Sequence, residues 1–332
     1  MDSTPGQVNP MRYAASVIVC APIKQQNLLP CESDFKVLML KRSVQISSRT
    51  FQTPANAGNE GTRGERLGLS MWGMVDPEDS NANWRELLLK EDESRVARSN
   101  MKDILPYYIA AVRETFEESG IALTTPPPSL PIAELTQWRK KVHSTASAFI
   151  DFCAAARTRP NVSQLVHWCN WITPTTVKSR FDTQFFLTIL DTAQPSTGGA
   201  ELGQVGKFDG IETVDLDWFT PQQALDAFDA GRIALFLPQY CTLLELSTMK
   251  LSDLQSYVAG DRSRTPADLA PMLPERRTLD NGQTVLVLAG DELHAGTPGA
   301  KGQLHRVHVR MEKDQFKEIR VVKSDGKDNA KL

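Results

Sequence analysis

One stretch of this chain reads Arg113-Glu114-Thr115-Phe116-Glu117-Glu118-Ser119-Gly120-Ile121. Pro106 suits the first turn of a helix, and Gly120 suits the left-handed position just past a helix end. Between them, apolar residues recur at helical spacing: Ile109, Val112 and Phe116. We therefore predict a helix between Pro106 and Gly120 whose apolar side faces a core.

Three glutamates lie on the opposite side of this helix. Glu114 precedes Glu117 by three residues and Glu118 by four, so the three carboxylates share one side. Like charges this close weaken a free helix, whereas Mg²⁺ prefers carboxylate oxygens and also binds substrate phosphates. Arg113 lies four residues before Glu117, which allows a salt bridge that holds that carboxylate. The spacing favours a divalent metal site over a solvated acidic face.

The pattern Arg-Glu-x-x-Glu-Glu-x-Gly is also specific. It fixes five residue types and is expected by chance on the order of once in several thousand chains of average composition. A cation held there can orient one water for attack and neutralise charge on phosphorus oxygens. The helix therefore indicates chemistry at phosphorus.

This stretch resembles the second half of the signature of the Nudix hydrolases. The signature reads Gly, five residues, Glu, seven residues, then Arg-Glu-aliphatic-x-Glu-Glu-x-Gly-aliphatic, and Thr115 is the one departure in its second half. In the first half, Gly73 is the opening glycine, and Asp79 stands where Glu is usual. The 33 residues 80–112, in place of seven, then precede Arg113.

An insertion at this place is similar to the peroxisomal coenzyme A diphosphatase branch of that family. Other segments over residues 12–250 are also similar to that branch: Val37-Leu-Met-Leu-Lys-Arg-Ser43, Met74-Val75-Asp76, Trp171-Ile-Thr-Pro174, Arg180-Phe-Asp-Thr183 and Trp218-Phe-Thr-Pro221. One departure is Trp72-Gly73, where the branch has paired glycines.

The resemblance implies roles for particular residues. Glu114 and Glu118 are expected as principal ligands of Mg²⁺ or Mn²⁺, with Glu117 assisting or binding a second ion. The expected catalytic group is Arg113, Glu114 and Glu117. Family members often take a further acid from a distant loop, for which the candidates are Glu201, Asp209 and Glu212. The candidates for substrate binding are Arg42, Arg49 and Gly73.

The activity implied is hydrolysis of the diphosphate of coenzyme A or an acyl-coenzyme A, giving 3′,5′-ADP and a 4′-phosphopantetheine product. Another nucleoside diphosphate compound, such as ADP-ribose, NADH or a capped RNA end, is an alternative substrate. A nucleotide-binding protein of the same fold without turnover is the alternative from a different class. The expected partner in each case is a nucleotide-containing small molecule.

The composition limits the remaining classes of function. The formal net charge of −3 gives no general attraction to nucleic acid or to an anionic membrane. The five cysteines form no Cys-x-x-Cys pair, so neither a disulfide framework nor a zinc site is indicated. No apolar run approaches the roughly 18 residues of a membrane span.

Periodicity along the chain predicts an α/β (α+β) fold, a Nudix-type α/β/α sandwich with a mixed sheet, helical insertions and a β-rich carboxy-terminal extension. Strands are expected at residues 14–21, 35–42, 168–174, 181–190 and 212–219, and a helix is expected between Thr220 and Gly231. The predicted division is a flexible amino terminus (1–11), a Nudix domain (12–259) with insertions at about 77–105 and 124–165, an extension (260–323) and a tail (324–332).

The last three residues suggest a cellular location. Ala330, Lys331 and Leu332 form a conservative variant of Ser-Lys-Leu, the carboxy-terminal address that the peroxisomal import receptor binds. Polar residues precede them, so the tripeptide is expected to be accessible. The alternatives are an accidental polar tail and a cytoplasmic protein.

Overall fold

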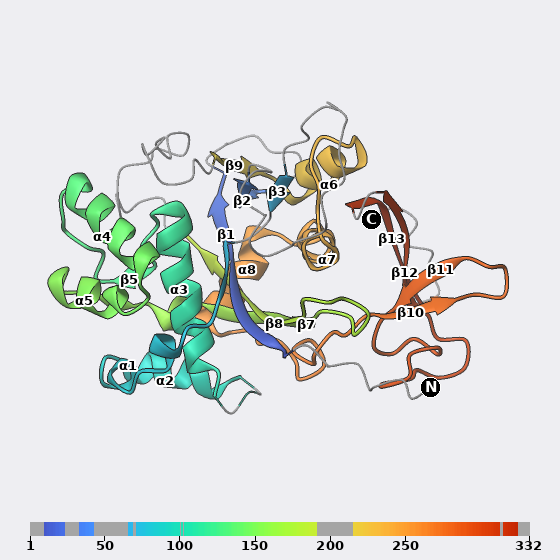
Figure 1. The fold of residues 1–332 in the computed structure, drawn as a ribbon, viewed down its shortest axis with the longest axis horizontal. Coiled ribbons are helices and arrows are strands. Elements are labelled where there is room, and N and C mark those ends of the chain that lie inside the picture. Colours follow the sequence, from blue (N-terminus) through green and yellow to red (C-terminus); the bar gives the residue numbers. More distant parts are fainter. Residues whose placement is uncertain are drawn as a thin grey trace, which may run out of the picture.

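The computed structural model describes residues 10–23, 33–42, 66–68, 71–99, 101, 103–190, 215–312 and 315–324. A mixed sheet occupies the middle of the molecule, with helices on both of its faces (Figure 1). A second, smaller sheet lies at the end opposite to the helices of the insertions. This arrangement confirms the predicted α/β sandwich with a β-rich extension.

The central sheet has seven strands in the order β3-β2-β1-β8-β7, with β4 paired to β1 and β9 paired to β2. Its strands are β1 (Arg12–Pro22), β2 (Phe35–Arg42), β3 (Arg66–Gly68), β4 (Met71–Met74), β7 (Val166–Ile172), β8 (Phe181–Ile189) and β9 (Asp215–Phe219). Strand β1 runs parallel to β8 and antiparallel to β2 and β4. Residues 14–21 are all buried because helices cover both faces of β1, which explains their almost unbroken apolar run.

Alternation along β1 divides the core between the two faces of the sheet. Ala15, Val17 and Val19 face a cluster that includes α3 (Leu105–Ser119). Ile18 and Cys20 face the other cluster, which includes three helices: α6 (Pro221–Asp229), α7 (Leu237–Leu246) and α8 (Leu251–Ala259). The helix that carries the glutamates is therefore fixed against the centre of the sheet.

Short elements of the two insertions surround α3. They are η2 (Pro77–Ser80), α1 (Asn83–Glu86), α2 (Lys90–Ala97), β5 (Thr124–Thr125), α4 (Ile132–Ser144), α5 (Ala148–Ala155), β6 (Arg159–Pro160) and η3 (Val162–Gln164). The first insertion reaches the interior, since Trp84 on α1 is 3% exposed and its ring centroid lies 5.6 Å from that of Phe149 on α5. The two insertions thus contribute to one core.

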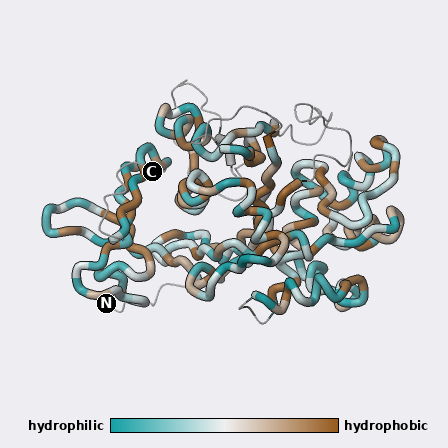
Figure 2. Tube along the Cα trace, turned by 180° about the vertical axis from the view of Figure 1, so that it is seen from behind, coloured by the Kyte–Doolittle hydropathy of each residue, from teal (hydrophilic) through white to brown (hydrophobic). Residues whose placement is uncertain are grey.

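The carboxy-terminal sheet has the order β10-β11-β12-β13. Its strands are β10 (Glu275–Thr278), β11 (Thr284–Val287), β12 (His305–Glu312) and β13 (Gln315–Lys323). A hairpin joins β10 to β11, and Gly282 in its turn has φ of 81°. Viewed from behind, the outer loops of this sheet are hydrophilic, and hydrophobic residues gather along the central strands (Figure 2). Among the described residues, no helix is long and apolar enough to cross a membrane.

Candidate active site

Helix α3 presents the glutamates at its carboxy-terminal end. It begins at Leu105 and ends at Ser119, and Gly120 follows with φ of 77° and donates its N–H to the carbonyl of Phe116, as a left-handed cap does. The predicted apolar face is buried. Thr115, the departure from the signature, is also fully buried, and its Oγ1 donates to the Ala111 carbonyl over 2.7 Å. The hydroxyl is therefore satisfied within the helix and does not disturb its packing.

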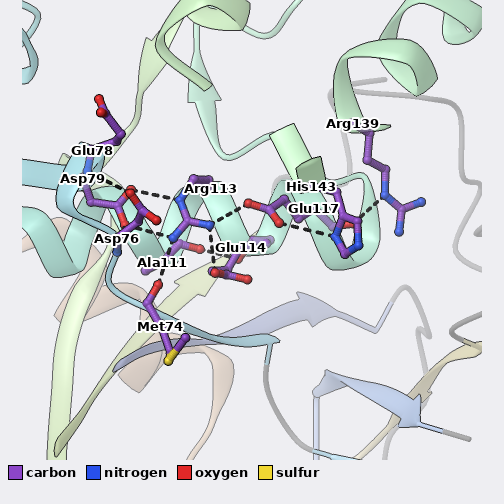
Figure 3. Close-up of polar contacts among 11 residues, drawn as sticks. Met74, Asp76, Glu78, Asp79, Ala111, Arg113, Glu114, Glu117, Arg139 and His143 are labelled. Atoms are coloured by element: carbon purple, nitrogen blue, oxygen red, sulfur yellow. Dashed lines mark hydrogen bonds and ion pairs between the residues drawn. The ribbon is translucent and has the colours of Figure 1, made fainter. Parts of the chain in front are cut away.

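The Arg113 guanidinium connects the acidic groups of the site (Figure 3). Its Nη1 lies 2.8 Å from Oε1 of Glu114 and 2.6 Å from Oε1 of Glu117. Its Nε and Nη2 each donate over 2.9 Å to one oxygen of Asp79, and Nη2 also donates to the Met74 carbonyl over 2.9 Å. Asp79 and the Met74 carbonyl fix the guanidinium, and the guanidinium in turn orients Glu114 and Glu117.

Asp79 occupies the place that a longer acid has in the family signature. It lies in η2, where its carboxylate also accepts the N–H of Asp76 over 2.8 Å, and it is 2% exposed. The two-bond contact with Arg113 forms although 33 residues (80–112) separate them in sequence. The insertion therefore leaves the two ends of the signature in contact.

Gly73 lies against the Glu114 carboxyl. A Cβ added to Gly73 would lie 1.8 Å from Cδ of Glu114, far inside van der Waals contact. The missing side chain thus gives Glu114 its space beside β4. A contact between Gly73 and substrate stays a prediction.

One positive group faces three acids in this cluster. Arg113 is the partner of Asp79, Glu114 and Glu117, which leaves a formal excess of two negative charges when all are ionised. Burial raises the pKa of Glu114 to about 7, and the nearby Glu117 and Asp79 add to this rise while Arg113 opposes it. Burial also raises the pKa of Glu117. The cluster therefore lacks positive charge.

The donor atoms fit a hard divalent cation. Carboxylate oxygens are the ligands that Mg²⁺ and Mn²⁺ prefer, and a cation of charge two would balance the excess. Across the described ranges, no three His, Cys, Asp or Glu side chains already converge as a metal site. One oxygen each of Glu114 and Glu117 is bonded to Arg113 instead.

The structure brings two residues of α4 to the site that sequence reasoning missed. His143 Nδ1 lies 3.6 Å from Oε2 of Glu117, and Arg139 contacts the end of α3 (Figure 3). Residues 139 and 143 are four apart on a helix and share one face. The sequence predicts a helical insertion at about 124–165, but nothing local indicates which element a face of its helix meets.

Several predicted site residues lie outside the described residues: Arg49, Glu201, Asp209, Glu212, Ala330, Lys331 and Leu332. For Arg42 the structure describes the backbone, which pairs with Arg66. Of the sequence candidates, those brought together are Gly73, Asp79, Arg113, Glu114 and Glu117, with Glu118 one residue further along α3.

Curated relatives share much of the chain's length. "Acyl-coenzyme A diphosphatase NUDT19" of Gallus gallus is 28% identical over 339 residues, covering 88% of this chain and 82% of the relative. The protein of the same name from Xenopus laevis is 27% identical, covering 83% and 75% respectively. The one from Homo sapiens is 31% identical, covering 61% and 55%.

A solved structure and a family model agree with this picture. A NUDIX hydrolase from Alicyclobacillus acidocaldarius matches with a TM-score of 0.50 and 18% identity, covering 73% of this chain and 93% of that one, which shows the fold alone. The model of the NUDT19 Nudix domain matches residues 11–246, a span that runs from β1 to α7 and includes both insertions. With α3 and its acids inside that span, the chain belongs to the family of NUDT19 Nudix domains.

Proposed function

We propose that this protein is a divalent-metal-dependent hydrolase that cleaves the diphosphate of coenzyme A or an acyl-coenzyme A. The products are 3′,5′-ADP and a 4′-phosphopantetheine compound. The observation that carries this proposal is the Arg113 cluster, in which one guanidinium orients Glu114 and Glu117 on a helix packed against the central sheet. The names of the relatives support coenzyme A derivatives as the substrate class.

The glutamates of α3 have separate roles in this proposal. Glu114 and Glu118 are the principal metal ligands, and Glu117 assists. A bound Mg²⁺ or Mn²⁺ would polarise a water and neutralise charge on the phosphate oxygens. Arg113 holds Oε1 of Glu117, so Oε2 is the oxygen that we assign to accept the proton of the attacking water.

Release of 3′,5′-ADP from coenzyme A by the purified protein tests this function. We expect release with Mg²⁺ or Mn²⁺ and none in a chelator, with product separated by ion-exchange chromatography. ADP-ribose, NADH and capped RNA are assayed in parallel. Turnover of one of these but not of coenzyme A would contradict the substrate assignment, and calorimetric binding without any product would favour a non-catalytic protein.

Variants of the helix test the metal assignment. Glu117→Gln and Glu118→Gln should each reduce the rate at least about 100-fold, because each removes a charged oxygen near the reacting phosphorus. Glu134→Gln is the matched control, since Glu134 is exposed on α4, and it should retain the wild-type rate. Full activity of both helix variants would show that these residues are not the site.

For location, we propose import into peroxisomes through Ala330-Lys331-Leu332. The receptor binds such a tripeptide only at the free carboxy terminus. A fluorescent protein fused ahead of the chain should show punctate fluorescence, which one glycine added after Leu332 should make diffuse. Punctate fluorescence that survives the addition would contradict the proposal.

A further inference from the structure

The last turn of α3 is where a helix is least constrained by its own hydrogen bonds. The final four carbonyls of a helix have no intrahelical partner, and helix ends open locally at little cost. Glu117 and Glu118 lie in this turn, and α3 ends at Ser119. Their backbone therefore needs support from outside the helix.

Arg139 of α4 supplies that support. Its Nε donates to the carbonyl of Glu117 over 2.6 Å, and its Nη2 donates to the carbonyl of Glu118 over 2.7 Å. The planar guanidinium bonds two successive carbonyls at once, which the single ammonium of lysine cannot reproduce with the same geometry. Both bonded residues carry a carboxylate of the proposed site.

Packing fixes α4 where Arg139 can reach. The ring centroid of Trp138 lies 6.1 Å from that of Phe152. The Phe152 ring stacks on Phe116 of α3, with 4.6 Å between their centroids. Val142, on the next turn of α4, is 1% exposed. These apolar contacts hold α4 beside α3, so Arg139 lies within hydrogen-bonding distance of the last turn of α3.

From these contacts we propose that Arg139 is a positioning residue, which holds the turn carrying Glu117 and Glu118 so that their carboxylates are preorganised for a divalent cation. This inference rests on the metal ligands assigned in the proposed function. It gives the second insertion a role in the site, because its helix α4 provides the guanidinium.

Charge and positioning predict opposite effects. A guanidinium beside a cation site repels the cation, so removing its charge alone would tighten metal binding. Loss of positioning would weaken it, because the carboxylates must then be ordered when the metal binds. The direction of the change in metal affinity therefore separates the two explanations.

The test is Mn²⁺ affinity of the metal-free full-length protein, measured from the electron paramagnetic resonance signal of free Mn²⁺. Arg139→Gln and Arg139→Lys should both raise the Kd about tenfold or more, as loss of outer-shell partners does. Lys140→Gln removes the same charge from the next, exposed position of α4 and should leave the Kd within about twofold. The Tm of each variant is recorded alongside.

Three results would overturn the inference. They are a lower Tm with an unchanged Kd, tighter binding in Arg139→Gln, and full recovery by lysine, which would mean that the bonds of one guanidinium to two carbonyls are not needed. Arg139→Lys is the milder change and keeps the test usable if the glutamine variant does not fold. If wild-type protein cleaves no coenzyme A but Arg139→Gln weakens Mn²⁺ binding, the proposed function fails and the positioning role stands. If wild-type protein cleaves coenzyme A but Arg139→Gln leaves Mn²⁺ binding unchanged, the positioning role fails and the proposed function stands.

Discussion

Protonation of the single residue Glu114 is linked to the stability of the fold. Burial and neighbouring acids raise its pKa from 4.5 to about 7. The folded protein then holds this proton more tightly than the unfolded chain, so stability is lost as pH rises through that interval. A bound divalent cation would offset the cost, since it favours the ionised carboxylate.

This gives a prediction for the metal-free protein. In a chelator, the free energy of unfolding should fall by up to about 3 kcal/mol between pH 4.5 and pH 7 through Glu114. Glu114→Gln cannot ionise and should remove that part of the slope, as measured by urea unfolding across the pH range. Glu134→Gln should keep the wild-type slope. Equal slopes in wild type and Glu114→Gln would show that Glu114 is not the group responsible.

Adding one methyl group at Gly73 tests whether the position of the Glu114 carboxyl matters for activity. In Gly73→Ala the new methyl would occupy the space of the Glu114 carboxyl, which must move away from Arg113. We expect a loss of activity of about 100-fold or more with the protein still folded, because misplacing a catalytic group by about 1 Å has such effects. Gly296→Ala is the control, since its Cβ would lie at an ordinary 3.5 Å from His294. Wild-type rates in Gly73→Ala would contradict this.

At the scale of elements, Asp79 and Arg113 join η2 to α3. Asp79→Asn keeps the shape of the side chain but leaves the buried Arg113 with one charged partner fewer. We expect a loss of about 3 kcal/mol in the free energy of unfolding, the lower range for breaking a buried pair. Glu78→Gln, on the exposed side of the same short helix, should change it by less than about 0.5 kcal/mol. Equal effects of both changes in urea unfolding would argue against the contact.

Some helices and strands could be predicted from the sequence, and others could not. Strand β1 and helices α3 and α6 were predictable because their signals are local: an apolar run, a proline near the start and a glycine after the end. The sequence reading did not predict α7 and α8, and α7 carries apolar residues on several sides, which weakens its periodicity.

The contacts that complete the site were harder to predict than its acids. The spacing of Glu114, Glu117 and Glu118 follows from helix geometry, so one helix determines it. The contact of Arg139 with α3 depends on how α4 packs through Phe152, and that of Asp79 depends on the path of the insertion. Both are long-range outcomes of core packing that no local pattern encodes.

At the scale of the whole molecule, the carboxy-terminal sheet shares a core with the Nudix domain. Leu288, Val307 and Ile319 belong to the same buried cluster as Phe228 of α6 and Leu243 of α7. Covering these helices buries apolar surface that would otherwise face water. The sheet therefore stabilises the helices against which it packs.

Truncation tests this dependence. A chain ending after Gly260 should lose several degrees in Tm or aggregate on expression, because the apolar faces of α6 and α7 become exposed. A chain ending after Ser324 removes only the tail and should keep the wild-type Tm. Differential scanning fluorimetry and soluble yield measure both. An unchanged Tm in the shorter chain would show that the sheet is an independent unit.

The contact between Asp79 and Arg113 also makes the intervening segment a closed loop. The entropy cost of closing a loop grows only with the logarithm of its length, by about 0.6 kcal/mol for each doubling. Trp84 and Leu105 within this segment are buried, so the part that can lengthen at little cost is the link between α2 and α3, where Arg98 and Asp103 are exposed. A foreign domain inserted beside Arg98 or Asp103 should therefore be tolerated, with Asp79 and Arg113 still in contact.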